Sequence, residues 1–280
     1  MRRALPTLLV ALFACAGDPA PPAPLHPTGA LAPLPDAVVA MGSGAATPLL
    51  QALARAYSAR RPALPVRVER SVGTTGGVAA ALDGAVDLGL VGRALRPGEA
   101  PELEQLPVAL DAVVVAASPD VERQGLTRAE LRALYSGDEV GGLTLLLRES
   151  GESGTECLES AFAELPALRR AAAASGKFRI LDHDDAMVHA LLTLPRTAGV
   201  FSLGEIHGWR LPLRPLALDG LVPSVSTAEA RTWPAVRTLR VVFRPERRAR
   251  LQPFFAFLAS PEARAVTREA GYAPLPEARP

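Results

Sequence analysis

Short apolar runs alternate with segments of helical periodicity along most of the chain. Apolar runs at 37–41, 66–70, 88–91 and 143–147 predict buried strands, and apolar residues at helical spacing follow them. Strands that alternate with helices in this way are typical of an α/β domain that contains parallel strands.

Three of these predicted strands run into loops rich in glycine, serine and threonine, at Gly42–Thr47, Ser71–Gly77 and Arg148–Thr155. Thr47 is the expected N-cap of the first helix, with a proline at its first turn. Two later helices are each expected to open with a capping box, formed by Thr127 with Glu130 and by Ser153 with Glu156. A short helix is expected to begin near residue 78.

Such loops favour an anion, because each one directs unpaired backbone N–H groups and the positive end of a helix dipole beyond the strands. Arg148 adds a guanidinium with two parallel donors. Side-chain hydroxyls can add hydrogen bonds, from Ser43, Thr47, Thr74, Thr75, Ser153 and Thr155.

A long apolar run at 108–117 lies between the loops and is predicted to be a strand that crosses from one lobe to another. A return crossing is expected between 220 and 238. The second lobe would then be an insertion in the first. The tail is expected to be helical, with Ser260 as an N-cap and Gly271 as a left-handed stop.

The amino terminus is typical of a secretory signal. Two arginines precede an apolar segment at 4–14 that is too short to span a bilayer. It ends in LFAC, which resembles the lipobox of bacterial lipoproteins and predicts lipidation at Cys15; the alternative is an ordinary signal peptide. Cys157 would then have no disulfide partner. The proline-rich segment 16–35 predicts a semi-rigid stalk.

Composition narrows the class of protein. Of 280 residues, 49% are hydrophobic and 21% are charged, with a formal net charge of +1. These values exclude a mostly disordered chain and give no electrostatic argument for nucleic-acid binding. Beyond the signal, no segment is apolar over the roughly 18 residues that a membrane helix needs, so membrane contact is expected only through a lipid anchor.

Nucleotide, catalytic and metal motifs are incomplete. The single lysine, Lys177, lacks the surroundings of a Walker loop, and Thr47 stands where a dinucleotide fingerprint needs glycine. A nucleophile elbow around Ser153 fails at Thr155. The acidic cluster at 182–185 is expected to form the first turn of a helix rather than a metal site. Cys157 is expected to be inert beside two glutamates. We therefore expect no catalysis, no cofactor and no metal.

The loops and their order resemble the substrate-binding proteins of phosphate ABC transporters, which belong to the type II periplasmic binding protein family. The resemblance covers nearly all of residues 37–276. It is carried by Gly42–Pro48, Gly73–Gly77 with Asp83–Gly89, Leu126–Gly137, Arg148–Thr155 and Phe257–Ala263. The resemblance implies a two-lobed α/β fold, in which each lobe is a mixed sheet flanked by helices and two crossing strands form the hinge.

The resemblance also implies a set of ligand-binding residues in the cleft. They are Gly44, Ala46, Thr47, Thr74, Thr75, Arg93, Arg148, Ser153, Gly154 and Thr155. Two positions depart from the family. Gly92 replaces an aspartate that accepts the proton of a protonated phosphate, with Arg93 beside it either adding a contact or pointing into solvent. The third loop is one residue longer, with Glu152 inserted.

The expected organisation is a signal peptide at 1–15, a stalk at 16–35, lobe I at 36–112 with 238–280, and lobe II at 113–237. The expected function is binding of a small inorganic oxyanion, phosphate first, and its delivery to an ABC permease in the inner membrane. The protein would be a lipid-anchored monomer in the periplasm or cell envelope. One alternative is a sensor or envelope interaction protein with a different ligand or none. Another is a hydrolase that uses Ser153.

Overall fold

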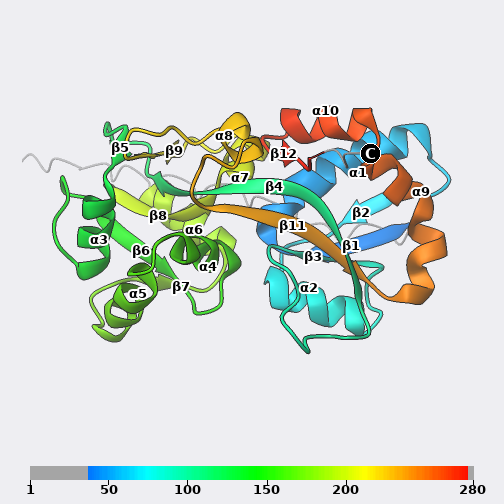
Figure 1. Ribbon diagram of the computed structural model, residues 1–280, viewed down its shortest axis with the longest axis horizontal. Helices are drawn as coiled ribbons and strands as arrows, with labels where there is room; N and C mark the ends of the chain where they lie inside the picture. Colours follow the sequence, from blue (N-terminus) through cyan, green and yellow to red (C-terminus); the bar gives the residue numbers. More distant parts are fainter. Residues whose placement is uncertain (1–36, 277–280) are drawn as a thin grey trace, which may run out of the picture.

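Two bodies of similar architecture are joined by a pair of long antiparallel strands (Figure 1). The computed structural model describes residues 37–276. The joining strands are β4 (Glu104–Ala117) and β11 (Val236–Phe243). The crossing strand predicted at 108–117 is confirmed as part of β4, which already begins at Glu104. The return strand lies later than predicted, because β11 overlaps the expected interval 220–238 only at 236–238. We call the body that contains the first three strands lobe I and the other body lobe II.

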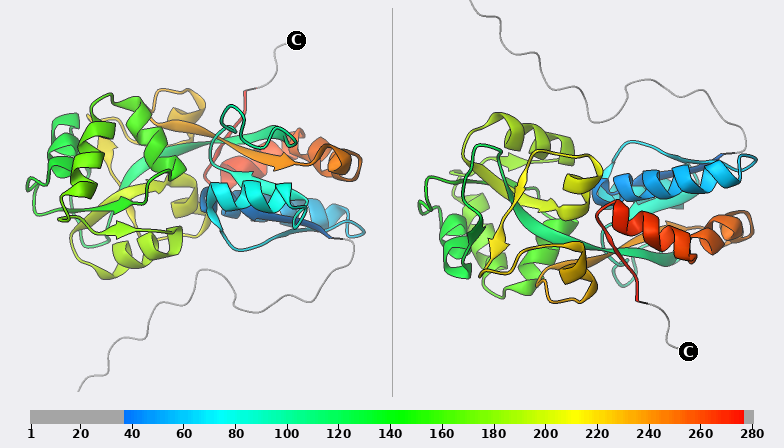
Figure 2. Two further views of the ribbon diagram at one scale, coloured as in Figure 1. Left: turned by 90° about the horizontal axis from the view of Figure 1, so that it is seen from below. Right: turned by 90° about the horizontal axis from the view of Figure 1, so that it is seen from above.

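Lobe I is a five-stranded part of the sheet in the order β2-β1-β3-β11-β4. β1 pairs in parallel with both β2 and β3, as the alternation of strands and helices along the chain predicts. Its further elements are β1 (Val38–Gly42), η1 (Gly44–Ala46), α1 (Thr47–Arg60), β2 (Val66–Val68), α2 (Gly73–Leu82), β3 (Leu88–Val91), η2 (Pro245–Arg247), α9 (Arg248–Leu258) and α10 (Pro261–Glu269). α1 and α10 lie side by side on one face (Figure 2).

Lobe II continues the same sheet from β4 in the order β8-β6-β7. β8 runs antiparallel to β4, whereas β6 runs parallel to both β8 and β7, so the sheet is mixed. Its longer elements are α3 (Arg128–Ser136), β6 (Thr144–Arg148), α4 (Ser153–Ala161), α5 (Leu165–Ala174), β7 (Ile180–Leu181), α6 (Asp184–Thr193), β8 (Thr197–Ser202), α7 (Leu203–Gly208) and α8 (Val225–Glu229). Two-residue strands complete the fold: β5 (Gly125–Leu126), β9 (Arg214–Pro215), β10 (Ala217–Leu218) and β12 (Ala273–Pro274).

Each lobe has its own hydrophobic core. In lobe I the fully buried ring of Tyr57 on α1 packs against Phe254 and Phe257 of α9, with ring centroids 5.1 and 5.6 Å away. In lobe II a larger cluster surrounds β4, β6 and β8. β4 contributes residues to both cores, so it is anchored at each end. The lobe boundaries expected at 112/113 and 237/238 stay a prediction.

Several helix starts differ from expectation. α1 begins at Thr47, one residue before the expected start, and the Thr47 hydroxyl donates to the Ser43 carbonyl instead of capping. α2 begins at Gly73, so most of the second predicted loop is helical. Gly77 can take part because a Cβ there would lie 2.7 Å from the Leu90 carbonyl oxygen. Tertiary packing has here outweighed the low helix propensity of glycine.

Other predicted caps are confirmed. α3 opens with the capping box of Thr127 and Glu130, and the Ser260 side chain caps α10. Gly271 has the left-handed backbone expected of a helix stop, with φ of 88°. Within residues 37–276, no helix combines the length and apolar character needed to cross a membrane. The signal, the stalk and Cys15 lie outside the described residues.

Candidate functional site

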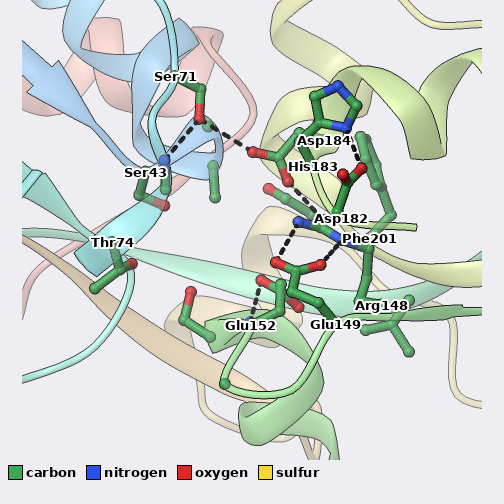
Figure 3. A pocket seen from close by; sticks show the side chains of 18 of the residues that line it. Ser43, Ser71, Thr74, Arg148, Glu149, Glu152, Asp182, His183, Asp184 and Phe201 are labelled. Atoms are coloured by element: carbon green, nitrogen blue, oxygen red, sulfur yellow. Dashed lines mark hydrogen bonds and ion pairs between the residues drawn. The ribbon is translucent and has the colours of Figure 1, made fainter. Parts of the chain in front are cut away.

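A cavity of about 370 Å³ lies between the lobes. Lobe I contributes Ser43 to Ala45 and Ser71 to Thr75, and lobe II contributes the loop after β6 and the start of α6. Arg237 reaches the cavity from the joining strand β11. Figure 3 shows these side chains converging from both lobes. All three predicted loops therefore meet in one cleft, because each loop follows a strand that ends next to the cavity.

On the lobe I side, the cleft wall consists of small residues and hydroxyls. The Ser71 hydroxyl donates to the Gly42 carbonyl at 3.0 Å, and Thr74 Oγ1 accepts the Gly92 N–H at 3.0 Å. Gly44 has no room for a side chain, because a Cβ there would lie 2.0 Å from Asp184 Oδ2 of lobe II. The two lobes therefore pack tightly against each other at Gly44.

Arg148 is placed at the end of β6 and is only 6% exposed. Its Nη1 donates to Asp184 Oδ1 at 2.6 Å, while Nε and Nη2 donate to Glu149 at 2.9 and 3.1 Å. Burial lowers the pKa of Arg148, but the carboxylates of Asp184, Glu152 and Glu149 outweigh that effect and raise it. The guanidinium is thus fully charged and paired with two carboxylates of its own chain.

A side-chain carboxylate caps the start of α4. The N-cap of α4 is Glu152, not Ser153, so the predicted capping box is wrong. The Glu152 carboxylate accepts the N–H of Gly154 at 2.6 Å and of Thr155 at 2.6 Å, and the Thr155 hydroxyl at 2.9 Å. Burial raises the pKa of Glu152, but Arg237, Arg148 and these N–H donors outweigh it, so the pKa is lowered.

Arg237 links the hinge to the cleft. It lies directly opposite Asp111 in the β4–β11 ladder, and its Nε donates to Asp111 Oδ2 at 2.9 Å. Its Nη1 donates to the Ser153 hydroxyl at 3.0 Å and lies 3.7 Å from Glu152 Oε1. Asp111 is further fixed by the Ser202 hydroxyl at 2.9 Å. A buried ion pair between the joining strands therefore supports the loop before α4.

Glu205 on α7 lines the cleft and is only 2% exposed. Its Oε1 has no hydrogen-bond partner among the described residues. Burial, followed by the nearby charge of Asp184, raises the pKa of Glu205 well above its ordinary value. Burial and the charge of Asp184 therefore favour the protonated form of the Glu205 carboxyl in the cleft.

Polar contacts between the lobes close the cleft. Asp184 Oδ2 accepts the Ser71 hydroxyl at 3.3 Å, and Asp185 lies 3.6 Å from Arg70. Arg96 of lobe I also donates to Glu156 of lobe II at 2.7 Å. In each of these contacts lobe II contributes the carboxylate.

Six of the ten predicted ligand-binding residues line this cleft: Gly44, Thr74, Thr75, Arg148, Ser153 and Gly154. Ala46 and Thr47 lie fully buried behind it. Thr155 lines a smaller neighbouring hollow and binds Glu152. Arg93 neither enters the cleft nor points into solvent, because it binds both carboxylate oxygens of Glu99 at 2.6 and 2.9 Å.

Sequence reasoning missed Arg237, Asp111 and Glu205, and it treated Asp184 only as a helix-start residue. A signal existed for the first two, because each is a charged residue inside a long apolar strand of the hinge. A charge in such a position is seldom buried without a partner. Glu205 gave no such signal, since it reads as an ordinary acid in the first turn of α7.

Neither Ser153 nor Cys157 is activated as a nucleophile. Ser153 Oγ accepts a hydrogen bond from a guanidinium rather than giving its proton to a base. Burial raises the pKa of Cys157 to about 11, so the thiol is protonated at neutral pH, as expected of an inert cysteine. Within 37–276, no group of three or more His, Cys, Asp or Glu side chains is arranged to hold a metal ion.

Comparison with protein families gives one match that spans most of the chain. Residues 28–262 match the model of the PBP superfamily domain. In a search of curated proteins, a 97-residue segment is 31% identical to the phosphate-binding protein PstS 2 of Streptococcus pneumoniae serotype 4. That segment is 35% of this chain and spans about a third (33%) of the length of that relative.

Solved structures share the fold over nearly the whole described part of the chain. One, from Clostridium perfringens, is described as a phosphate ABC transporter substrate-binding protein with bound phosphate; it has a TM-score of 0.72 at 17% identity and covers 86% of this chain and 100% of its own. Another, an ABC-type phosphate transport receptor from Vibrio cholerae, has a TM-score of 0.59 at 19% identity and covers 84% and 99%. The fold is thus that of type II periplasmic binding proteins.

Proposed function

This chain belongs to the PBP superfamily, and we propose on that premise that it binds a small inorganic oxyanion, phosphate first, in the cleft between its lobes. Bound ligand would be delivered to an ABC permease in the inner membrane. The relatives described above support this choice of ligand and partner. We propose no catalysis, because a binding protein of this superfamily acts by closing on its ligand.

The observation that carries the proposal is the convergence of three loops on one cleft. Three helix starts border the cavity, those of η1, α2 and α4. Arg148, at the end of β6, lines the same cavity. Backbone N–H groups at helix starts and a guanidinium together form a site for a tetrahedral or carboxylate anion. Ser43, Ser71 and Thr74 place hydroxyls on the opposite wall.

The experiment is calorimetric titration of the purified protein with phosphate, sulfate, molybdate and tungstate. We expect heat on binding with phosphate. Arg148→Ala should weaken binding by roughly 2 to 5 kcal/mol, the cost of truncating one partner of a buried charged contact. Arg132, which is about half exposed and lies on α3, is the control, and Arg132→Ala should leave the affinity unchanged. Absence of heat with all four anions would refute the proposal.

We further propose that the protein is a lipid-anchored monomer of the periplasm or cell envelope, held at Cys15 and spaced from the membrane by the stalk at 16–35. The lipobox-like LFAC sequence supports the anchor. Cys15→Ser should move the protein from the membrane fraction to the soluble fraction after cell lysis. Unchanged partition would contradict the anchor without affecting the ligand.

A second candidate function keeps the fold without the transport. The protein would then be a sensor or an interaction protein of the envelope that has a different ligand or none. The pairing of Arg148 and of the α4 N–H groups with internal carboxylates favours it. Absence of oxyanion binding, together with capture of an envelope protein by the immobilised chain, would select this function.

A further inference from the structure

The N-terminal donors of α4 are already occupied by a group that resembles an anionic ligand. Two oxygens of the Glu152 carboxylate accept the N–H groups of Gly154 and Thr155, each at 2.6 Å, and the Thr155 hydroxyl at 2.9 Å. A phosphate or carboxylate bound to this helix start would place its oxygens at the same donors. The Glu152 side chain is 13% exposed, so it is largely enclosed there.

The groups around Glu152 stabilise a negative charge on its carboxylate. Arg237 Nη1 lies 3.7 Å from its Oε1 and also binds Ser153. The opposing wall leaves no space for a second acid. A Cβ at Gly92 would lie 2.3 Å from Ser153 Oγ and 3.3 Å from Arg237 Nη1. A side chain at position 92 would therefore collide with the loop that carries Glu152.

We propose that Glu152 is an internal carboxylate ligand of the α4 anion site, and that its occupancy determines which external anions the cleft accepts. The inference deepens the proposed function and rests on it. An external oxyanion must either displace Glu152 or bind without the donors of α4. Either route weakens binding, because Glu152 competes for these donors from within the chain at high effective concentration.

Glu152→Ala tests this proposal, because it frees the α4 donors without altering them. We expect this variant to bind phosphate about 10- to 100-fold more tightly than the parent chain. A gain of this size corresponds to the free energy of a hydrogen bond to a charged group. Glu152→Gln retains the shape without the charge and should show a smaller gain. It also serves if the alanine variant does not fold.

The control is Glu156→Gln, whose amide oxygen can still accept the hydrogen bond from Arg96 of the other lobe. Glu156 lies in the first turn of the same helix, but its carboxylate binds Arg96 rather than the N–H groups of α4. The substitution takes away one negative charge near the site and leaves Glu152 in place. We expect no gain in phosphate affinity. An equal gain in both variants would overturn the proposal, because net charge alone would explain it.

A second measurement uses thermal unfolding with added formate, acetate or phosphate. If the inference holds, these anions raise the Tm of Glu152→Ala above any rise in the parent, because they replace the lost carboxylate. Affinity and Tm responses equal to those of the parent would overturn the inference while leaving the proposed function intact.

Two further outcomes separate the claims. Anion binding by the variants with none by the parent would support the internal-ligand role and refute phosphate binding as the function of the natural protein. Absence of anion binding by the parent and by both folded variants would overturn both claims.

Discussion

At the scale of single residues, more carboxyl groups than guanidinium groups line the cleft. Its lining contains the carboxyl groups of Glu149, Glu152, Asp182, Asp184, Asp185 and Glu205, whereas the guanidiniums are those of Arg148 and Arg237. Four of these acids interact directly with arginines: Glu149, Glu152, Asp184 and Asp185. Glu205 differs from them, because it is buried and the pKa of its carboxyl is raised.

Glu205→Gln is a pH test at the residue scale. A carboxyl with a raised pKa in the folded state costs nothing below its unfolded value, near 4.5, and destabilises the fold as pH rises toward its folded pKa. The variant should therefore gain stability over the parent above that pH, by up to about 1.4 kcal/mol per pH unit. Urea unfolding between pH 4 and pH 8 measures the difference. A pH-independent difference would contradict a raised pKa at Glu205.

At the scale of elements, β4 and β11 each carry one charge into the buried hinge. Asp111 and Arg237 sit opposite each other in the ladder, and both are almost fully buried. Burial lowers the pKa of Arg237, but Asp111 and Glu152 outweigh this effect and raise it. The arginine therefore stays charged and orients Ser153, which couples the hinge strands to the start of α4.

Asp111→Ala should lower the free energy of unfolding by about 3 to 5 kcal/mol, because it leaves a buried guanidinium without its counter-charge. Glu104 on the same strand is the matched control. Its carboxylate binds Arg248 at the surface, so Glu104→Ala should cost less than about 1 kcal/mol. Urea unfolding of the two variants provides the comparison. Equal losses would show that burial of the pair does not matter.

At the scale of the whole molecule, polar contacts between residues of lobe I and lobe II span the cleft. Asp184 on α6 binds Arg148 within lobe II and the Ser71 hydroxyl of lobe I. A hinge made of two strands bends easily only if few contacts cross the cleft. Removing one should therefore shift the balance toward an open form.

Asp184→Ala should increase the radius of gyration in small-angle X-ray scattering, since the variant loses the hydrogen bond between Asp184 of lobe II and Ser71 of lobe I. Asp182 provides the control, because its side chain is 87% exposed and pairs with His183 on the surface. Asp182→Ala should leave the radius unchanged. Identical scattering from both variants would show that Asp184 does not hold the cleft closed.

Strands, loops and crossing points were within reach of sequence reasoning, because they depend on local patterns. β3 lies at the predicted residues 88–91, and the capping box at Thr127 follows from side chains three residues apart. The start of α2 was not predictable in this way. Gly77 of this helix packs against Gly42 and Leu90, which are its neighbours only in the folded chain.

The sequence by itself determined a two-lobed α/β protein with three polar loops and with Arg148 at the end of a strand, since apolar periodicity and turn chemistry act over a few residues. Only the tertiary structure decided which of these donors are free. Asp184 reaches Arg148 across 36 positions of the chain, and Glu152 rather than Ser153 takes the start of α4. Those pairings depend on burial and on charges brought together by folding, which no local pattern records.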